Sequence, residues 1–114
     1  MKIFSTAPEG NELAEAVGID YIKFSISMME EFNDWMKETD KTAQPILAIV
    51  DLLVILARKY TIDANLLIKK TVQEWKQTFN DWFVRCGSRI PVRFREGIKA
   101  NGDELFKELE TYGH

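Results

Sequence analysis

The stretch ILAIVDLLVILA, residues 46–57, is the most apolar part of the chain and decides the fold. It is far shorter than the roughly 20 apolar residues that a membrane-spanning helix needs, so it predicts a helix buried within the protein. From Ile46 to Tyr60, apolar residues surround nearly the whole helix, which indicates the central and most enclosed element. Thr42 is the predicted cap of this helix, and Pro45 is tolerated in its first turn.

The chain before this stretch predicts two helices. The segment Thr6 to Glu9 has the pattern of a capping box, and the short helix that it begins would end at Gly18. Asp20 would then cap a long helix that ends near Glu38. The apolar residues of this long helix recur at steps of three and four, which predicts a buried stripe. The stripe contains Tyr21, Phe24, Met28, Phe32 and Trp35, widened by Ile22, Met29 and Met36.

The chain after the central stretch predicts a third long helix. It would begin at Thr61 or Asp63 and end near Cys86, because Gly87 is a common helix stop. Its apolar positions also follow a helical period and predict a second buried stripe. This stripe contains Ile68, Val72, Trp75, Phe79, Phe83 and Cys86.

The last quarter of the sequence is less regular. Residues 90–95 alternate enough for an edge strand, yet Pro91 could equally begin a short helix that runs to Ala100. The pair Asn101-Gly102 predicts a turn, and Asp103 would cap a last helix that ends near Tyr112. The only histidine, His114, is expected to be mobile at the end of the chain.

Together these segments predict an all-α fold, a small helical bundle of four to five helices in a single domain, residues 1–114. The lone Cys86 lies on an apolar stripe, which favours packing over reactivity and allows no internal disulfide. One cysteine and a first segment without a signal-peptide pattern lead us to expect a cytoplasmic protein that has no membrane as a partner.

Charge is unevenly distributed along the chain. Residues 1–55 carry four lysines against ten acids, and residues 56–114 carry eleven basic residues against eight acids. The densest basic cluster is the candidate partner-binding site: Arg85, Arg89, Arg93, Arg95 and Lys99. It could meet an acidic protein surface or phosphate, or it could be a solvated face that pairs with the acidic half of the chain.

The residues available for catalysis are few. One histidine and one cysteine exclude a Ser-His-Asp or Cys-His arrangement within one chain, and neither phosphate-binding glycine motif is present. Carboxylates remain as candidate magnesium ligands: Glu31 and Asp34 share a helix face, and Asp51 is the only acid of the central helix. Glu30 is a fourth candidate. The alternative is that Glu31 and Asp34 are surface acids and that Asp51 pairs with a basic residue.

The order of these acids resembles a family. Residues 30–38, EEFNDWMKE, look like the first acidic segment of MazG-like all-α nucleotide pyrophosphohydrolases, and residues 48–57 look like their E-x-x-D helix. The segment Lys59 to Asp63 resembles the turn that follows. The resemblance, which covers about residues 28–76, implies that the acids hold Mg²⁺ and that a metal-activated water cleaves a nucleoside triphosphate. Ala48, Asp34 and Trp75 depart from the family pattern, where a Glu, a Glu and an Asn are expected.

Three functions are therefore open. The first is a non-catalytic interaction protein without a cofactor, an accessory factor or subunit that binds a protein partner, with self-association also open. Three Trp, seven Phe and four Met favour it, because such residues dominate binding interfaces. The second is a divergent MazG-like hydrolase that uses Mg²⁺ with Glu31, Asp34 and Asp51. The third is contact with nucleic acid through Arg85 to Lys99, against which the net charge of −3 counts.

Overall fold

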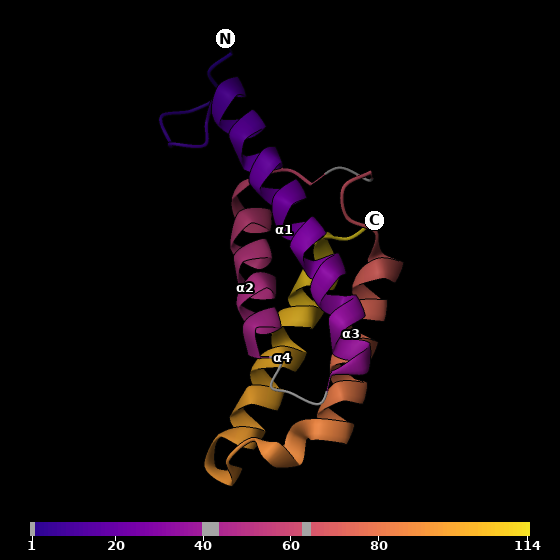
Figure 1. Ribbon diagram of the computed structural model, residues 1–114. Coiled ribbons are helices and arrows are strands. Elements are labelled where there is room, and N and C mark those ends of the chain that lie inside the picture. Colours follow the sequence, from indigo (N-terminus) through magenta and orange to yellow (C-terminus); the bar gives the residue numbers. More distant parts are fainter. Residues whose placement is uncertain (1, 40–43, 63–64) are drawn as a thin grey trace.

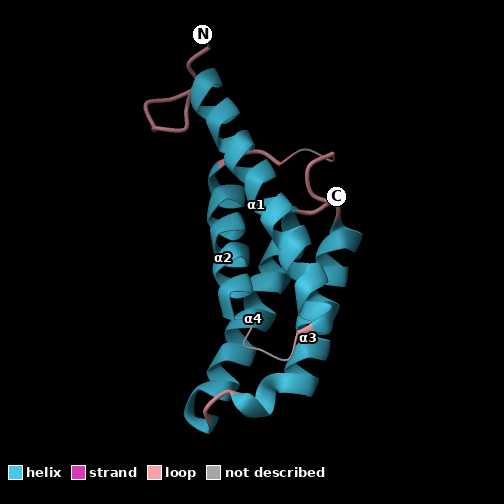
Figure 2. Ribbon diagram, in the orientation of Figure 1, coloured by secondary structure: helices cyan, strands magenta, loops and turns pink. Residues whose placement is uncertain are grey.

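The computed structural model describes residues 2–39, 44–62 and 65–114. Its elements are four α-helices and one 3₁₀ turn: α1 (Glu12–Glu38), α2 (Gln44–Lys59), α3 (Lys69–Cys86), η1 (Gly87–Arg89) and α4 (Val92–Tyr112). The prediction of an all-α bundle is confirmed (Figure 2). No helix in the described part of the chain is both long enough and apolar enough to cross a membrane.

The four helices form a bundle in which sequence neighbours are not always spatial neighbours. Helices α1 and α3 run in one direction and α2 and α4 in the other (Figure 1). Helix α1 packs against α2 and α3, and α4 packs against the same two helices. Going around the bundle, the order is therefore α1, α2, α4, α3, and the consecutive helices α2 and α3 occupy opposite corners.

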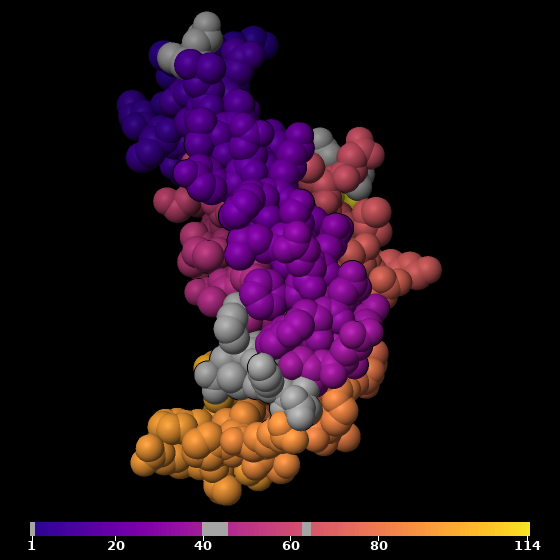
Figure 3. All heavy atoms as spheres, viewed as in Figure 1, coloured from indigo at the N-terminus to yellow at the C-terminus, as the bar shows by residue number. Residues whose placement is uncertain are grey.

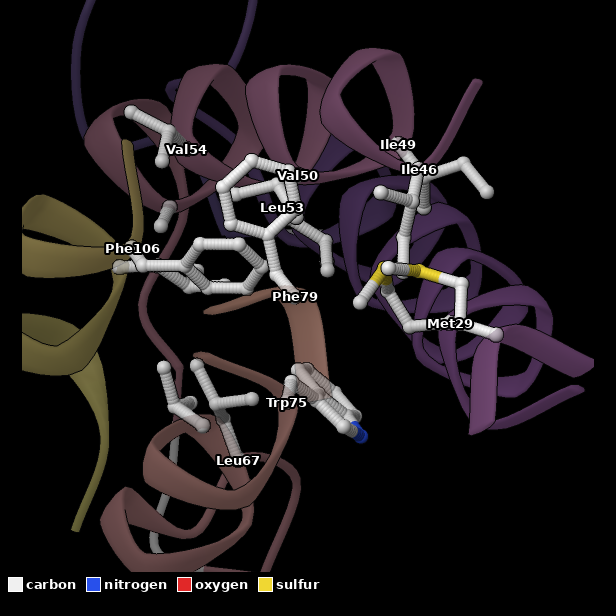
Figure 4. Packing of buried hydrophobic residues seen from close by; sticks show 14 of the residues in the cluster. Met29, Ile46, Ile49, Val50, Leu53, Val54, Leu67, Trp75, Phe79 and Phe106 are labelled. Atoms are coloured by element: carbon white, nitrogen blue, oxygen red, sulfur yellow. The ribbon is translucent and has the colours of Figure 1, made fainter. Parts of the chain in front are cut away.

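The four helices share one core, and its aromatic part lies where α2, α3 and α4 meet. Phe79 of α3 packs against Trp82 and Phe106, with ring centroids 6.0 and 5.7 Å away. Val50 and Leu53 of α2 approach this group from the other side, as Figure 4 shows. All five side chains are almost fully buried. The burial of Phe79 was predicted, whereas Trp82 was not part of the predicted stripe.

Helix α1 differs from the prediction at its start. One continuous helix replaces the predicted pair, and Asn11 caps it by accepting a hydrogen bond from the backbone N–H of Ala14 at 2.9 Å. The predicted capping segment, Thr6 to Glu9, instead forms an exposed turn. Gly18 does not end the helix, because it lies buried against the ring of Tyr60, where a Cβ atom would come within 2.4 Å.

The buried face of α1 matches the predicted stripe only in part. Ile22, Met29 and Met36, which widen that stripe, are buried as predicted, and Ser25 and Asn33 join them on the face that packs in the core. Tyr21, Phe24 and Trp35 of the predicted stripe are exposed instead. The reason is that α1 has apolar residues on two faces about 100° apart, and periodicity alone cannot choose between them.

Helix α2 was predicted to be enclosed all round, and this was wrong. Leu52, Ile55 and Asp51 are exposed, because α1 and α4 cover only the inner half of the helix. Thr42, the predicted cap, lies outside the described residues.

Helix α3 ends at Cys86 as predicted but begins at Lys69, later than the predicted Thr61; the alternative start, Asp63, lies outside the described residues. Gly87 follows the helix but does not adopt the left-handed conformation that is typical of glycine at a helix end. Its φ of −58° is right-handed, and the chain continues directly into η1.

The two predicted C-terminal segments form one helix, α4. It starts after Pro91, which supports the helical alternative for residues 90–95, and it runs straight through Asn101-Gly102. The predicted turn is absent. Gly102 is buried under the ring of Phe79, and this tertiary contact outweighs the local preference of Asn-Gly for a turn. Asp103 pairs with Lys99 in the preceding turn instead of capping a helix.

The end of the chain is anchored, contrary to the expectation for His114. Its backbone N–H donates to the Leu67 carbonyl at 3.0 Å, and its carbonyl accepts from the N–H of Lys69 at 3.1 Å. The imidazole Nε2 lies 2.7 Å from the Ile62 oxygen. The chain end is thus fixed to the segment that leads into α3.

Two glycines of α4 should respond oppositely to a methyl group. At Gly97 a Cβ atom meets open space, so Gly97→Ala should raise stability by about 0.5–1 kcal/mol through helix propensity. At Gly102 a Cβ atom would lie 2.6 Å from the enclosed Phe79 ring, so Gly102→Ala should lower stability by about 1–2 kcal/mol despite the same gain. Urea unfolding of both variants measures the difference, and two stabilising substitutions would contradict the packing described.

Candidate functional site

A stripe of exposed apolar side chains follows the outer side of α1. Leu13, Val17, Tyr21 and Phe24 are 64, 53, 61 and 63% exposed, and Trp35 continues the row three turns later. Steps of four, four and three residues keep these side chains on one side of the helix. We call this set, Leu13, Val17, Tyr21, Phe24 and Trp35, the α1 stripe. It is separate from the face that the same helix buries in the core.

The first turns of α1 stand free of the bundle. With 27 residues against 16, α1 is about 40 Å long and α2 about 24 Å. In Figures 1 and 3 the start of α1 therefore projects beyond the other helices. The N-terminal segment folds back on this end through an isolated bridge between Ile3 and Asn11. The side chains of Ile3 and Phe4 in this segment are exposed.

The apolar surface continues from α1 onto α2. Gly18 touches Tyr60, which shows which sides of the two helices face each other. Tyr21 lies one turn after Gly18, and Leu52 lies two turns before Tyr60 on the same side of α2. Leu52 is 55% exposed, so the α1 side of α2 also presents an apolar side chain to solvent.

Carboxylates accompany the α1 stripe. Helix α1 contains seven acids and two lysines, a net charge of −5. Asp20 lies three residues after Val17 and four before Phe24, and Glu31 lies four before Trp35, so both share the exposed side of the helix. Within the described residues, the ion pair of this group is Asp34 with Lys37, at 3.9 Å. The apolar stripe therefore has an acidic rim.

The candidate magnesium ligands do not converge in this fold. Glu30, Glu31 and Asp34 are exposed on α1. Asp51, the only acid of the helix that was predicted to be enclosed, is exposed and lines a hollow between α2 and α4. That hollow lies on the side of α2 away from α1. Among the described residues, no three acids, cysteines or histidines lie close enough together to hold one metal ion.

Two of the basic candidates bind carbonyl groups of the chain itself. The Arg85 guanidinium donates to the carbonyls of Met36 and Thr39 at 2.8 and 3.0 Å and so satisfies the C-terminal end of α1. Arg95 donates to the carbonyls of Ser88 and Ile90 at 3.0 and 2.9 Å and holds η1 against α4. Both side chains therefore have a structural task.

The other three basic candidates lie on η1 and the first half of α4. Lys99 pairs with Asp103 at 2.5 Å and lies 5.9 Å from the centre of the Phe83 ring. Arg93 is exposed, and its guanidinium stands 4.6 Å from the centre of the Phe94 ring. Arg89 is exposed on η1. A partner-binding role for this segment stays a prediction, with Arg89 and Arg93 as its most accessible members.

An ion pair that the sequence did not suggest joins α2 to α4. Arg58 donates to both carboxylate oxygens of Glu108, from Nε at 2.7 Å and from Nη2 at 2.6 Å, and the Tyr112 hydroxyl lies 3.1 Å from the same carboxylate. The hydrogen bond from Arg58 lowers the pKa of Glu108 below its usual value. Fifty residues separate the partners, so no local pattern could have revealed the pair.

The Glu108 ion pair should make stability depend on pH. Because the pKa of Glu108 is lowered by folding, its stabilising effect is present above the usual glutamate value of 4.5 and is lost as the pH falls through the folded-state pKa. Glu108→Gln should therefore be less stable than the wild type at pH 7 and equal to it in strong acid. Urea unfolding across this pH range measures the gap, with Glu74→Gln on α3 as the control. A gap that stays constant with pH would contradict the assignment.

Neighbouring residues of α1 should differ sharply in their effect on stability. Ile22 is fully buried, so Ile22→Ala should cost about 2–4 kcal/mol. Tyr21 is exposed, so Tyr21→Ala should change the free energy of unfolding by no more than about 0.5 kcal/mol. Thermal unfolding of both variants at low protein concentration tests the pair. A large loss from Tyr21→Ala alone would show that the stripe belongs to the core.

Comparisons of this chain with protein-family models, with curated proteins and with solved structures found no match.

Proposed function

We propose that this protein is a non-catalytic helical interaction protein that binds a protein partner through the α1 stripe. The observation that carries the proposal is the alignment of Leu13, Val17, Tyr21 and Phe24, each more than half exposed, on one side of a helix that already buries a separate face. Contiguous exposed apolar surface of this kind marks interaction sites on folded proteins.

The composition of the stripe suits an interface. Transfer of a large apolar side chain from water to a buried site contributes about 1.5–3 kcal/mol, so Tyr21 and Phe24 alone could supply a substantial part of a binding free energy. Aromatic side chains near the centre of an interface also tend to dominate its energetics. Tyr21 and Phe24 occupy the middle of the surface, between Leu13 and Trp35 on α1.

The geometry favours this function over the two alternatives. The MazG-like hydrolase would need Glu31, Asp34 and Asp51 at one metal, yet Asp51 faces the α4 side of α2. Nucleic-acid contact would need free basic side chains, and Arg85 and Arg95 are bound to carbonyl groups. The proposed binding role needs no cofactor. It suits a cytoplasmic protein, since the single Cys86 is buried.

The function can be tested by site-specific photo-crosslinking in cells of the source organism. A photoreactive phenylalanine analogue in place of Phe24 should form an adduct with a second polypeptide. The same analogue in place of Lys107, an exposed residue of α4, should form none. Adding Tyr21→Glu to the position-24 variant should abolish the adduct without changing the melting temperature. Adducts of equal yield from both positions, or an adduct that Tyr21→Glu leaves intact, would contradict the proposal.

A further inference from the structure

The partner can be specified by the chemistry of the stripe. We infer that the partner contributes a basic amphipathic helix that lies lengthwise along the α1 stripe, with its apolar face on Tyr21 and Phe24 and its cations on the acidic rim. This inference rests on the proposed function and names the occupant of the same surface.

The shape of the surface fits a helix. Apolar side chains spaced by three and four residues complement an apolar face with the same spacing, as in other complexes of a helix with a helical groove. From Leu13 to Trp35 the stripe spans 23 residues, or about 33 Å of helix between the first and the last. Leu52 is exposed on the α1 side of α2, so a bound helix would contact α1 and α2 together.

The charge of the surface indicates a basic partner. Asp20 and Glu31 stand on the exposed side of α1, and neither has an ion-pair partner in the described part of the chain. Lysine or arginine on the flanks of a bound helix would pair with these carboxylates. Acidic flanks would instead add like-charge repulsion, which is how interfaces reject wrong partners.

The same charge argues against a second copy of α1 as the occupant. Residues 12–25 of α1 carry three acids and one lysine, and residues 26–38 carry four acids and one lysine. Both halves are therefore acidic. A symmetric pair of α1 helices would bring acid against acid whether the helices ran parallel or antiparallel.

Three synthetic peptides of 22 residues, each labelled with a fluorophore, test the inference by anisotropy with the full chain. The first has leucine at the core positions of a heptad and lysine on the flanks. The second has glutamate in place of the lysines, and the third is a scrambled form of the first. We expect the first peptide to bind about tenfold or more tightly than either control, with the advantage shrinking as salt is raised. The wavelength of maximum tryptophan emission should shift on binding, because Trp35 is the exposed tryptophan of the stripe. The emission of the Trp35→Phe variant should not shift.

Three double variants locate the contact, and the first two are matched because each removes two negative charges. Asp20→Asn with Glu31→Gln should weaken binding of the lysine peptide several-fold. Glu96→Gln with Glu104→Gln removes two exposed acids from α4 and changes the net charge equally, yet should leave binding unchanged. Tyr21→Glu with Phe24→Glu should abolish binding. Equal losses from the two carboxylate pairs would mean attraction by overall charge and would overturn the inference.

The remaining outcomes separate this inference from the proposed function. If the glutamate peptide binds as well as the lysine peptide and Phe24→Glu abolishes both, the basic partner is wrong while the stripe remains a docking surface. If no peptide binds and light scattering shows a dimer that Phe24→Glu dissociates, a second copy is the occupant, which also overturns the inference. If no peptide binds to a monomer, the basic helix is wrong, and photo-crosslinking from position 24 still decides the proposed function.

Discussion

The packing of Phe79 is the contact on which the bundle depends. Its ring lies against Phe106 of α4, covers Gly102, and meets Val50 and Leu53 of α2, so one side chain of α3 joins three helices (Figure 4). Interiors this dense tolerate little change in volume. Because α2 is held by this group, its outer side stays exposed, and α1 can cover only one edge of it. The exposed surface of α1 and α2 is thus a consequence of how the core is filled.

The sequence predicted the elements that have a single apolar face. Helix α3 is the clearest case: Val72, Trp75, Phe79 and Cys86 are buried as expected, and the helix ends at Cys86. Only the first residue of that stripe was clearly wrong, because Ile68 precedes the helix and is 49% exposed. Prediction failed where tertiary contacts override local signals. Glycine commonly ends a helix, yet Gly18 and Gly102 both lie inside helices. The rings of Tyr60 and Phe79 occupy the space that a side chain at these positions would fill. Those rings come from other helices, so a local pattern cannot contain the information.

The sequence predicted that the protein has an apolar interface, but it did not predict which residues form it. A heavy load of aromatic residues indicated an interface, but α1 has two apolar faces and periodicity favoured the one that proved to be exposed. The sequence Phe-Asn-Asp-Trp occurs twice, at residues 32–35 and 79–82, and it shows the same limit, because Trp82 is buried whereas Trp35 is exposed. The structural role of Arg85 could not be predicted from the sequence, because the carbonyls that it binds belong to residues 46 and 49 positions away.

The anchored chain end has a mechanical consequence. His114 is bound through its backbone to Leu67 and Lys69, so the segment that follows α4 and the segment that leads into α3 form one junction. A force applied at or beyond His114 would act first on this pair of hydrogen bonds. Helix α4 would begin to unwind from its end only after they had broken. A label or surface attachment at the C-terminus would therefore load the start of α3 as well as α4, and it would leave the projecting end of α1 mechanically free.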